Sequence, residues 1–185
     1  MISAKPFYLI PPIIFIGLIT VMYLGLGRKN PNELPSQMIG RDVPNLTLKQ
    51  LSDHPFLKMD DLKEPSIKIV NFWASWCAPC RVEHPNIQQL ADLGFPVHGI
   101  NYKDETSQAL QFLETLGNPY KSIGTDEGRT GLDWGLYGVP ETFVISGDGK
   151  VLLRHAGPIT NSIMINDILP ILIAVSYTHL RAHET

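Results

Sequence analysis

The chain has 185 residues, a formal net charge of −3 at pH 7 and 44% apolar residues. This length allows one domain with its own core plus an appendage, and the near-neutral charge argues against nucleic-acid binding through a basic surface. Two cysteines are too few for a framework of structural disulfides, or for a zinc site that needs about four ligands, so the pair is free for redox chemistry.

The N-terminal stretch from Phe7 to Gly27 is uncharged and about as long as the ~20 apolar residues that a helix needs to cross a bilayer. It is longer than the apolar core of a cleaved signal peptide and shows no small-residue cleavage site. We therefore predict an uncleaved anchor over residues 1–29, with a regular helix that begins near Pro12. A buried core helix is the alternative, and the flanking charges do not decide the orientation.

The anchor is followed by a predicted tether and then by the main domain. Residues 30–40 are rich in Pro, Asn and Ser, as flexible connections are. The domain is expected over residues 41–175. Polar and apolar residues alternate over residues 45–48, which predicts a half-buried strand, followed by an irregular stretch. The nearly continuous apolar run 67–73 predicts a central strand that is buried on both faces.

The rest of the domain alternates between helical and strand patterns. A helix should run from Cys80 to Leu93, and Pro85 should bend it without dividing it. This order predicts an α/β fold with a mixed sheet between helices. The further elements expected are a strand at 97–102, a helix at 106–116, a strand at 120–123, a short helix at 129–134, a hairpin of 140–145 with 150–154, and a helix at 162–174.

The segment Trp76-Cys77-Ala78-Pro79-Cys80 stands where the strand 67–73 passes into a helix. Free N–H groups and the helix dipole stabilise an anion at such a junction, which favours a thiolate on Cys77 and makes it the nucleophile. Cys80 lies about one turn further and can resolve a mixed disulfide. The alternative is a small structural disulfide, which would stabilise little because its loop is short. Apart from a redox-active Cys77–Cys80 disulfide, we expect neither a cofactor nor a metal.

Several motifs together carry a family resemblance. The WCAPC segment, with a Val-Pro dipeptide at the head of a later strand, resembles the thioredoxin fold. The chain is similar to the DsbE/CcmG family, the membrane-anchored thiol:disulfide interchange proteins of cytochrome c maturation. This resemblance extends from the anchor to about Pro170. The segments that make this resemblance specific are GINYKD at 99–104, GNPY at 117–120, DEGR at 126–129 and YGVPETFVI at 137–145.

The resemblance implies a place and a task. The domain would face the periplasm while the anchor stays in the bacterial inner membrane. The reduced cysteine pair would help to reduce the haem-binding Cys-x-x-Cys-His motif of apocytochrome c, or a maturation partner, with electrons from a membrane thiol transporter of the DsbD/CcdA kind. Pro140 would be a cis-proline facing the disulfide, with Val139 exposing its backbone to an extended substrate chain. A trans proline that starts a strand is the alternative.

Four further side chains are candidates near the sulfurs. Glu83 shares a helix face with Cys80, and Glu141 follows Pro140 and is expected beside the same site. A nearby carboxylate raises a thiol pKa, so both should make the protein more reducing, and we hypothesise that Glu83 exchanges protons with Cys80. Both glutamates could instead be solvated. Trp76 could shield the sulfurs and face the substrate, or pack in the core. His84 is expected to be exposed rather than catalytic.

Two other functions fit the cysteine pair. A related anchored reductase could serve another extracytoplasmic client, such as a copper-site protein. A metallochaperone could bind Cu(I) through the two thiolates, although it would need another ligand. Residues 176–185 match nothing in the family pattern; we interpret them as a non-native tail and expect them to be irregular.

Overall fold

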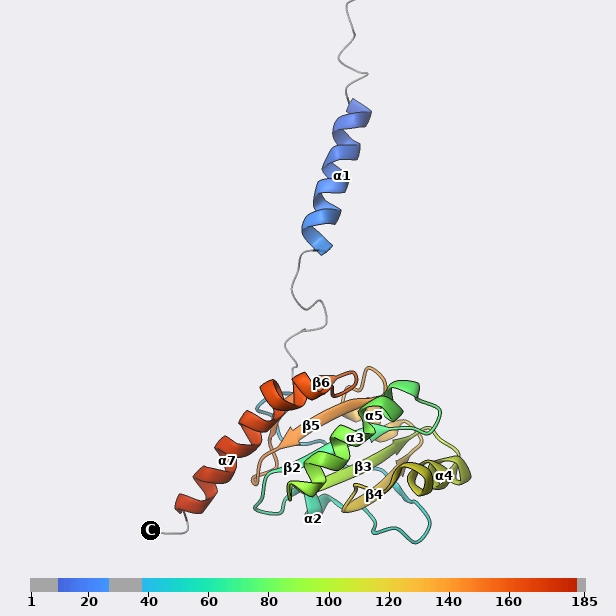
Figure 1. Ribbon diagram of the computed structural model, residues 1–185, viewed down its shortest axis with the longest axis vertical. Helices are drawn as coiled ribbons and strands as arrows, with labels where there is room; N and C mark the ends of the chain where they lie inside the picture. Colours follow the sequence, from blue (N-terminus) through green and yellow to red (C-terminus); the bar gives the residue numbers. More distant parts are fainter. Residues whose placement is uncertain (1–9, 27–37, 183–185) are drawn as a thin grey trace, which may run out of the picture. The chain divides into compact units, whose positions relative to one another are not determined.

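The computed structural model describes residues 10–26 and 38–182, and the chain divides into two compact units, Met1–Pro35 and Ser36–Thr185 (Figure 1). The tether proposed for residues 30–40 lies outside the described residues up to residue 37. The ends of the proposed anchor, residues 1–9 and 27–29, are also outside them.

The first unit contains helix α1, Ile10–Leu26, whose 17 residues carry no charge. The helix begins at Ile10, two residues earlier than expected, because Pro11 and Pro12 then stand in the first turn, where no intrahelical N–H bond is required. Its large apolar side chains from Ile10 to Tyr23 are exposed. Among the residues that the structure describes, no helix combines the length and apolarity needed to span a membrane.

The second unit is built on a six-stranded mixed sheet in the order β1-β4-β3-β2-β5-β6 (Figure 1). The neighbours β2–β3 and β3–β4 are parallel, whereas β1–β4, β2–β5 and β5–β6 are antiparallel. The strands are β1 Lys49–Gln50, β2 Lys68–Trp73, β3 Val97–Tyr102, β4 Ser122–Asp126, β5 Glu141–Ile145 and β6 Val151–Ala156. All six residues of β2 are buried, as its apolar run predicts.

Helices complete the α/β arrangement that the sequence predicts. Helix α3 runs without a break through Pro85, and α4 has the expected bounds. The C-terminal helix differs, because it contains a π-helical segment and continues beyond the expected end at Ala174. The helices are α2 Met59–Leu62, α3 Ala78–Asp92, α4 Thr106–Leu116, α5 Arg129–Asp133, α6 Asn161–Ile163, the π-helix Met164–Ile168 and α7 Leu169–Ala182.

The two faces of the sheet carry separate apolar clusters, because successive strand residues point to opposite sides. One cluster joins Ile69 and Trp73 of β2 to residues of α3, α4 and α7. The other joins Val70 and Phe72 to α2 and to Trp134, which follows α5. The cysteines belong to the first cluster. A strand residue therefore lies on the same side of the sheet as the sulfurs only if its side chain points to the face that carries this cluster.

Two local predictions were wrong. Residues 45–48 are not a strand, because the backbone N–H and C=O of Thr47 both bond the hydroxyl of Thr130; the edge strand β1 begins at Lys49. The predicted irregular tail is also wrong for its first part, since α7 continues to Ala182. A helix that is already nucleated extends at little cost through residues with no strong breaker.

Candidate active site

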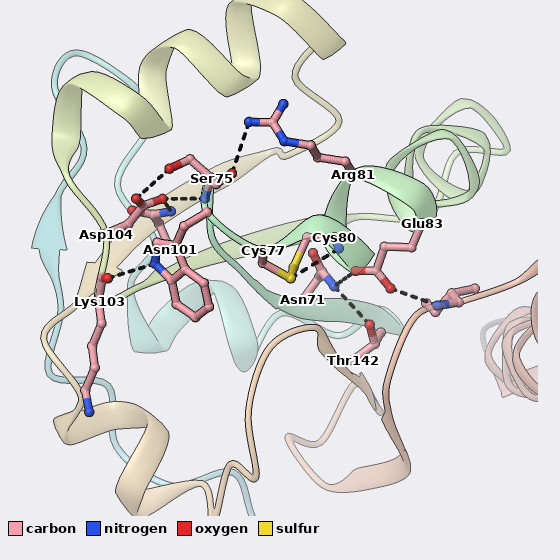
Figure 2. The surroundings of a disulfide bond; sticks show 12 residues. Asn71, Ser75, Cys77, Cys80, Arg81, Glu83, Asn101, Lys103, Asp104 and Thr142 are labelled. Carbon is pink, nitrogen blue, oxygen red and sulfur yellow. Dashed lines mark hydrogen bonds between the residues drawn. A yellow bond between two sulfur atoms is a disulfide. The ribbon is translucent and has the colours of Figure 1, made fainter.

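The two cysteines form a disulfide at the N-terminus of α3 (Figure 2). Their sulfurs are 2.13 Å apart, and the residues are only 3% and 2% exposed. Cys77 is the N-cap residue, and its Sγ accepts a hydrogen bond from the backbone N–H of Cys80 at 3.2 Å. This donor would stabilise a thiolate on Cys77 in the reduced protein, as the sequence predicts for the first cysteine.

The turn before Cys77 is held by the segment that follows β3 (Figure 2). Both the backbone N–H and the hydroxyl of Ser75 donate to the Asp104 carboxylate, each at 2.6 Å. The amide of Asn101 donates to the same carboxylate at 2.8 Å. Asp104 therefore ties the turn before Cys77 to the end of β3, a role that was not predicted from the sequence. Its place in the GINYKD motif was the available signal.

Trp76 lies on the surface rather than in the core, with 59% of its area exposed. Its indole N–H donates to the carbonyl of Lys103 at 3.0 Å, which orients the ring while leaving it accessible. An open hollow of about 680 Å³ lies beside it, lined by Ser75, Lys103, Asp104 and others. A ring held in this way next to a hollow can contact a protein chain that approaches the sulfurs.

Glu83 is almost completely buried, so a solvated role is excluded. Its Oε1 accepts from the Asn71 amide at 2.9 Å (Figure 2). Its Oε2 accepts from the backbone N–H of Ile159 at 2.8 Å. Burial raises the pKa of this carboxyl from 4.5 to about 7, and the two hydrogen bonds only partly oppose the shift. Near neutral pH, Glu83 can therefore both take up and release a proton.

Asn71 connects Glu83 to the rest of the site. It lies in the middle of β2, where it also donates to Thr142 Oγ1 at 3.0 Å and accepts from the Tyr120 hydroxyl at 2.8 Å. Burial raises the pKa of this tyrosine well above its usual value, so it remains a donor. Asn71 was not among the site residues predicted from the sequence. A lone amide within an apolar strand is nevertheless a visible signal, because a buried amide needs hydrogen-bond partners.

The Val139–Pro140 peptide bond is cis, so the trans alternative is excluded. Pro140 is buried and its carbonyl accepts from the Gly157 N–H at 2.9 Å, whereas Val139 remains partly exposed. The β5 strand that follows pairs with β2, the strand that leads to the cysteines. The sheet therefore brings the loop ahead of Pro140 to the end of the molecule at which β2 passes into α3.

Glu141 does not lie as expected. The Thr142 side chain reaches Asn71 on the face of α3, so Glu141, as its neighbour in β5, points to the opposite face. There it is fully buried and forms an ion pair with Arg154. A solvated role is thus excluded, and its charge is balanced by Arg154 rather than directed at the sulfurs.

The prediction for His84 was wrong, because this residue is only 3% exposed. The helix turns His84 inward, where Nε2 lies 3.0 Å from the Gly117 carbonyl and the ring packs edge-on against Phe112. Burial lowers the pKa of His84, which favours the neutral ring.

Among the residues that the structure describes, no group of three or more His, Cys, Asp or Glu side chains is placed to hold a metal ion.

The sequence is similar to those of known proteins over most of its length. The family model for Redoxin matches residues 38–169. The thiol:disulfide interchange protein HelX of Rhodobacter capsulatus is 44% identical over 171 residues, which cover 91% of this chain and 97% of HelX. DsbE of Escherichia coli K12 is 40% identical over 170 residues, which cover 88% and 91% of the two chains. The chain belongs to the DsbE family of thiol:disulfide interchange proteins.

A solved structure supports the same assignment. A crystal structure described as a DsbE-type protein from Chlorobium tepidum has a TM-score of 0.60 and 30% identity, covering 74% of this chain and 95% of that one. The thioredoxin-like fold, the family resemblance and the activity of a thiol–disulfide oxidoreductase are thereby confirmed. In this DsbE-family chain, Cys77 and Cys80 are the two cysteines of the sequence, and they form a disulfide in the structure.

Proposed function

We propose that this DsbE-family protein is a membrane-anchored periplasmic reductant in cytochrome c maturation. Its substrate would be the disulfide of the haem-binding Cys-x-x-Cys-His motif of apocytochrome c, or a disulfide of a maturation partner. The observation that carries the proposal is the Cys77–Cys80 disulfide at the start of α3, in a chain that keeps the GINYKD and GVPETF motifs of the family. A related reductase for another extracytoplasmic client is the alternative that the experiment below addresses.

Dithiol–disulfide exchange accounts for the chemistry. The Cys77 thiolate attacks one substrate sulfur, the substrate S–S bond breaks, and the released thiolate takes a proton. Cys80 then loses its proton and attacks Cys77, which releases the second substrate thiolate, again to be protonated. Two electrons pass to the substrate, and the Cys77–Cys80 bond seen in the structure forms. A membrane thiol transporter of the DsbD/CcdA kind would return two electrons to this bond.

Glu83 is proposed as the base that accepts the Cys80 proton. The two residues are three positions apart on α3, which places both side chains on one helix face (Figure 2). The Glu83 pKa of about 7 lies between that of an ordinary carboxyl and that of an ordinary thiol, which suits proton transfer near neutral pH. A charged Glu83 would also disfavour a second negative charge on Cys80 and thereby strengthen the protein as a reductant.

The substrate chain is proposed to lie between Trp76 and the loop ahead of Pro140. Trp76 presents an exposed ring, and Val139 precedes the cis bond with its side chain only partly buried. An extended chain can pair with exposed backbone groups in the manner of an added strand. This contact would hold a substrate disulfide against Cys77.

Residues 1–29 are proposed to attach the domain to the inner membrane. Helix α1 supports this proposal because it carries no charge and exposes large apolar side chains along its described length, and such a helix has no strongly polar face. Residues 30–40 would then act as the tether, and residues 41–175 as the periplasmic domain.

Trapping of the mixed disulfide tests the proposal. In the full-length chain expressed in a bacterium that makes c-type cytochromes, Cys80→Ser should hold the client covalently on Cys77. Apocytochrome c or a maturation protein should appear on a non-reducing gel and disappear on reduction. The matched control, Cys77→Ser with Cys80→Ser, should hold nothing. If only copper-site proteins are captured, the cytochrome role is wrong and the protein is a reductase for another extracytoplasmic client.

A further inference from the structure

The buried ion pair between Glu141 and Arg154 lies on the face of the sheet opposite to the cysteines. Glu141 is 0% exposed, and the Arg154 side chain is 6% exposed. Arg154 lies on β6 directly across from Phe143, two residues along from Glu141 on the same face of β5. Burial of two charges is costly unless further hydrogen bonds use their remaining donors and acceptors. These additional bonds indicate what the pair holds.

Both partners bind the loop that leads to the cis-proline. The second carboxylate oxygen of Glu141 accepts the backbone N–H of Tyr137 at 3.0 Å. Arg154 donates through Nη2 to the carbonyl of Gly135 at 2.5 Å. The guanidinium also lies over the Tyr137 ring, 4.2 Å from its centroid. Two strand residues therefore contact the loop at its backbone and at a side chain.

The middle of this loop is open to solvent. Gly135, Tyr137 and Gly138 are exposed, and a Cβ on Gly138 would meet nothing within 4 Å. Leu136 and Val139 pack partly against the second apolar cluster, and the N–H groups of Gly135 and Leu136 donate to the carbonyls of Leu132 and Gly131. Glu141 and Arg154 therefore hold the exposed middle of the loop, at Tyr137, between the partly packed residues Leu136 and Val139.

We propose that Glu141 and Arg154 are positioning residues that fix the loop 135–139 in the shape that receives the substrate chain. The proposal rests on the function proposed above, since it takes this loop as the substrate-binding element. It replaces the expected redox role of Glu141, whose carboxylate is matched by Arg154 on the far face of the sheet. The pair acts on substrate binding and leaves the electron affinity of the disulfide unaltered.

The test compares Glu141→Gln, Arg154→Gln and the double variant in the reduced full-length protein, with an oxidised Cys-x-x-Cys-His peptide as substrate. Each single variant leaves one buried charge unpaired, whereas the double variant removes both charges and remains informative if a single variant does not fold. The three measurements are KM and kcat for the peptide, the reduction potential of the Cys77–Cys80 pair, and amide hydrogen exchange at Tyr137. Lys150→Gln is the matched control, because it breaks an exposed ion pair with Asp42 beside the same hairpin.

In the double variant, we expect KM to rise at least fivefold, kcat to change less than twofold, and Tyr137 exchange to accelerate at least tenfold. The reduction potential and the control should stay at their wild-type values. A changed potential with an unchanged KM would overturn the proposal and restore a redox role for Glu141. An unchanged KM with faster Tyr137 exchange would also overturn it, because the ion pair would then hold the loop without affecting substrate binding. If the wild-type protein itself does not reduce the peptide, the proposed function fails rather than the positioning role.

Discussion

The amide of Asn71 donates to the carboxylate of Glu83 at 2.9 Å and thereby joins the central strand β2 to the active-site helix α3 (Figure 2). Both residues are buried, so this hydrogen bond forms where water cannot compete for either partner. It lowers the pKa of Glu83, whereas burial raises it, and burial is the larger effect. The result is a carboxyl poised near neutral pH on the helix face of Cys80.

Glu83→Gln should slow the resolution of mixed disulfides by roughly 10²-fold at pH 7.5, because the Cys80 proton loses its acceptor. In the wild-type protein, the rate should rise with pH as Glu83 loses its proton around pH 7. That inflection should be missing in the variant. Single-turnover decay of a Cys77 mixed disulfide between pH 5 and 9 measures both. Glu114→Gln, an exposed glutamate on α4, is the control; equal rates for the two variants would contradict the proton-transfer role.

The same substitution should change how the stability of the oxidised protein depends on pH. Because the folded-state pKa of about 7 exceeds the ordinary 4.5, the folded state binds more protons between these values, and stability falls as pH rises through them. The shift corresponds to about 3 kcal/mol at about 1.4 kcal/mol per pKa unit.

Urea unfolding at pH 4.5 and pH 8 measures this effect as the difference between the wild-type protein and Glu83→Gln. His98, whose pKa burial lowers to about 4, makes stability rise with pH, but it contributes equally to both proteins and cancels in the difference. A difference that does not vary with pH would show that Glu83 titrates in the folded protein as it does in the unfolded one.

Asn71→Ala should raise the pKa of Glu83 further, because it removes a hydrogen bond that favours the carboxylate. The inflection in the resolution rate should move to higher pH. The protein should also lose about 1–3 kcal/mol of stability, since the buried Tyr120 hydroxyl loses its acceptor. Thr142→Val is the control, as it removes another partner of Asn71 and leaves the bond to Glu83 in place. If the inflection stays at the same pH in Asn71→Ala, the Asn71 amide does not influence the pKa of Glu83.

Asp104→Ala should loosen the turn before Cys77. The variant loses both bonds from Ser75 and the bond from Asn101, which should cost about 1–3 kcal/mol and accelerate amide exchange at Ser75. Exchange followed by NMR and chemical unfolding measure the two effects. Glu105→Ala changes the neighbouring exposed carboxylate, which makes no cap hydrogen bond to α4, and should alter neither. Unaltered Ser75 exchange in Asp104→Ala would show that the turn holds its shape without this carboxylate.

The sequence alone determined the order of the main elements from β2 onward and the position of the cysteine pair between β2 and α3. Apolar runs, helical periodicity and turn residues can be recognised from neighbouring positions in the sequence, so β3 and α4 were predicted with their observed bounds. For the same reason, the WCAPC segment marked the strand-to-helix junction. Tertiary structure decided which buried polar groups meet. Asn71 and Glu83 are 12 positions apart, Asn71 and Thr142 are 71 apart, and no local pattern specifies such pairs.

Tertiary structure also decided the direction in which individual side chains point. Glu141 adjoins Pro140 in sequence but lies on the opposite face from the sulfurs, because β5 pairs with β2 in a register that turns Thr142 toward Asn71. His84 looked like a surface residue until α4 and the Gly117 carbonyl covered it. Sequence spacing sets which side chains share a face, but the packing partner of that face is chosen only when the chain folds back on itself.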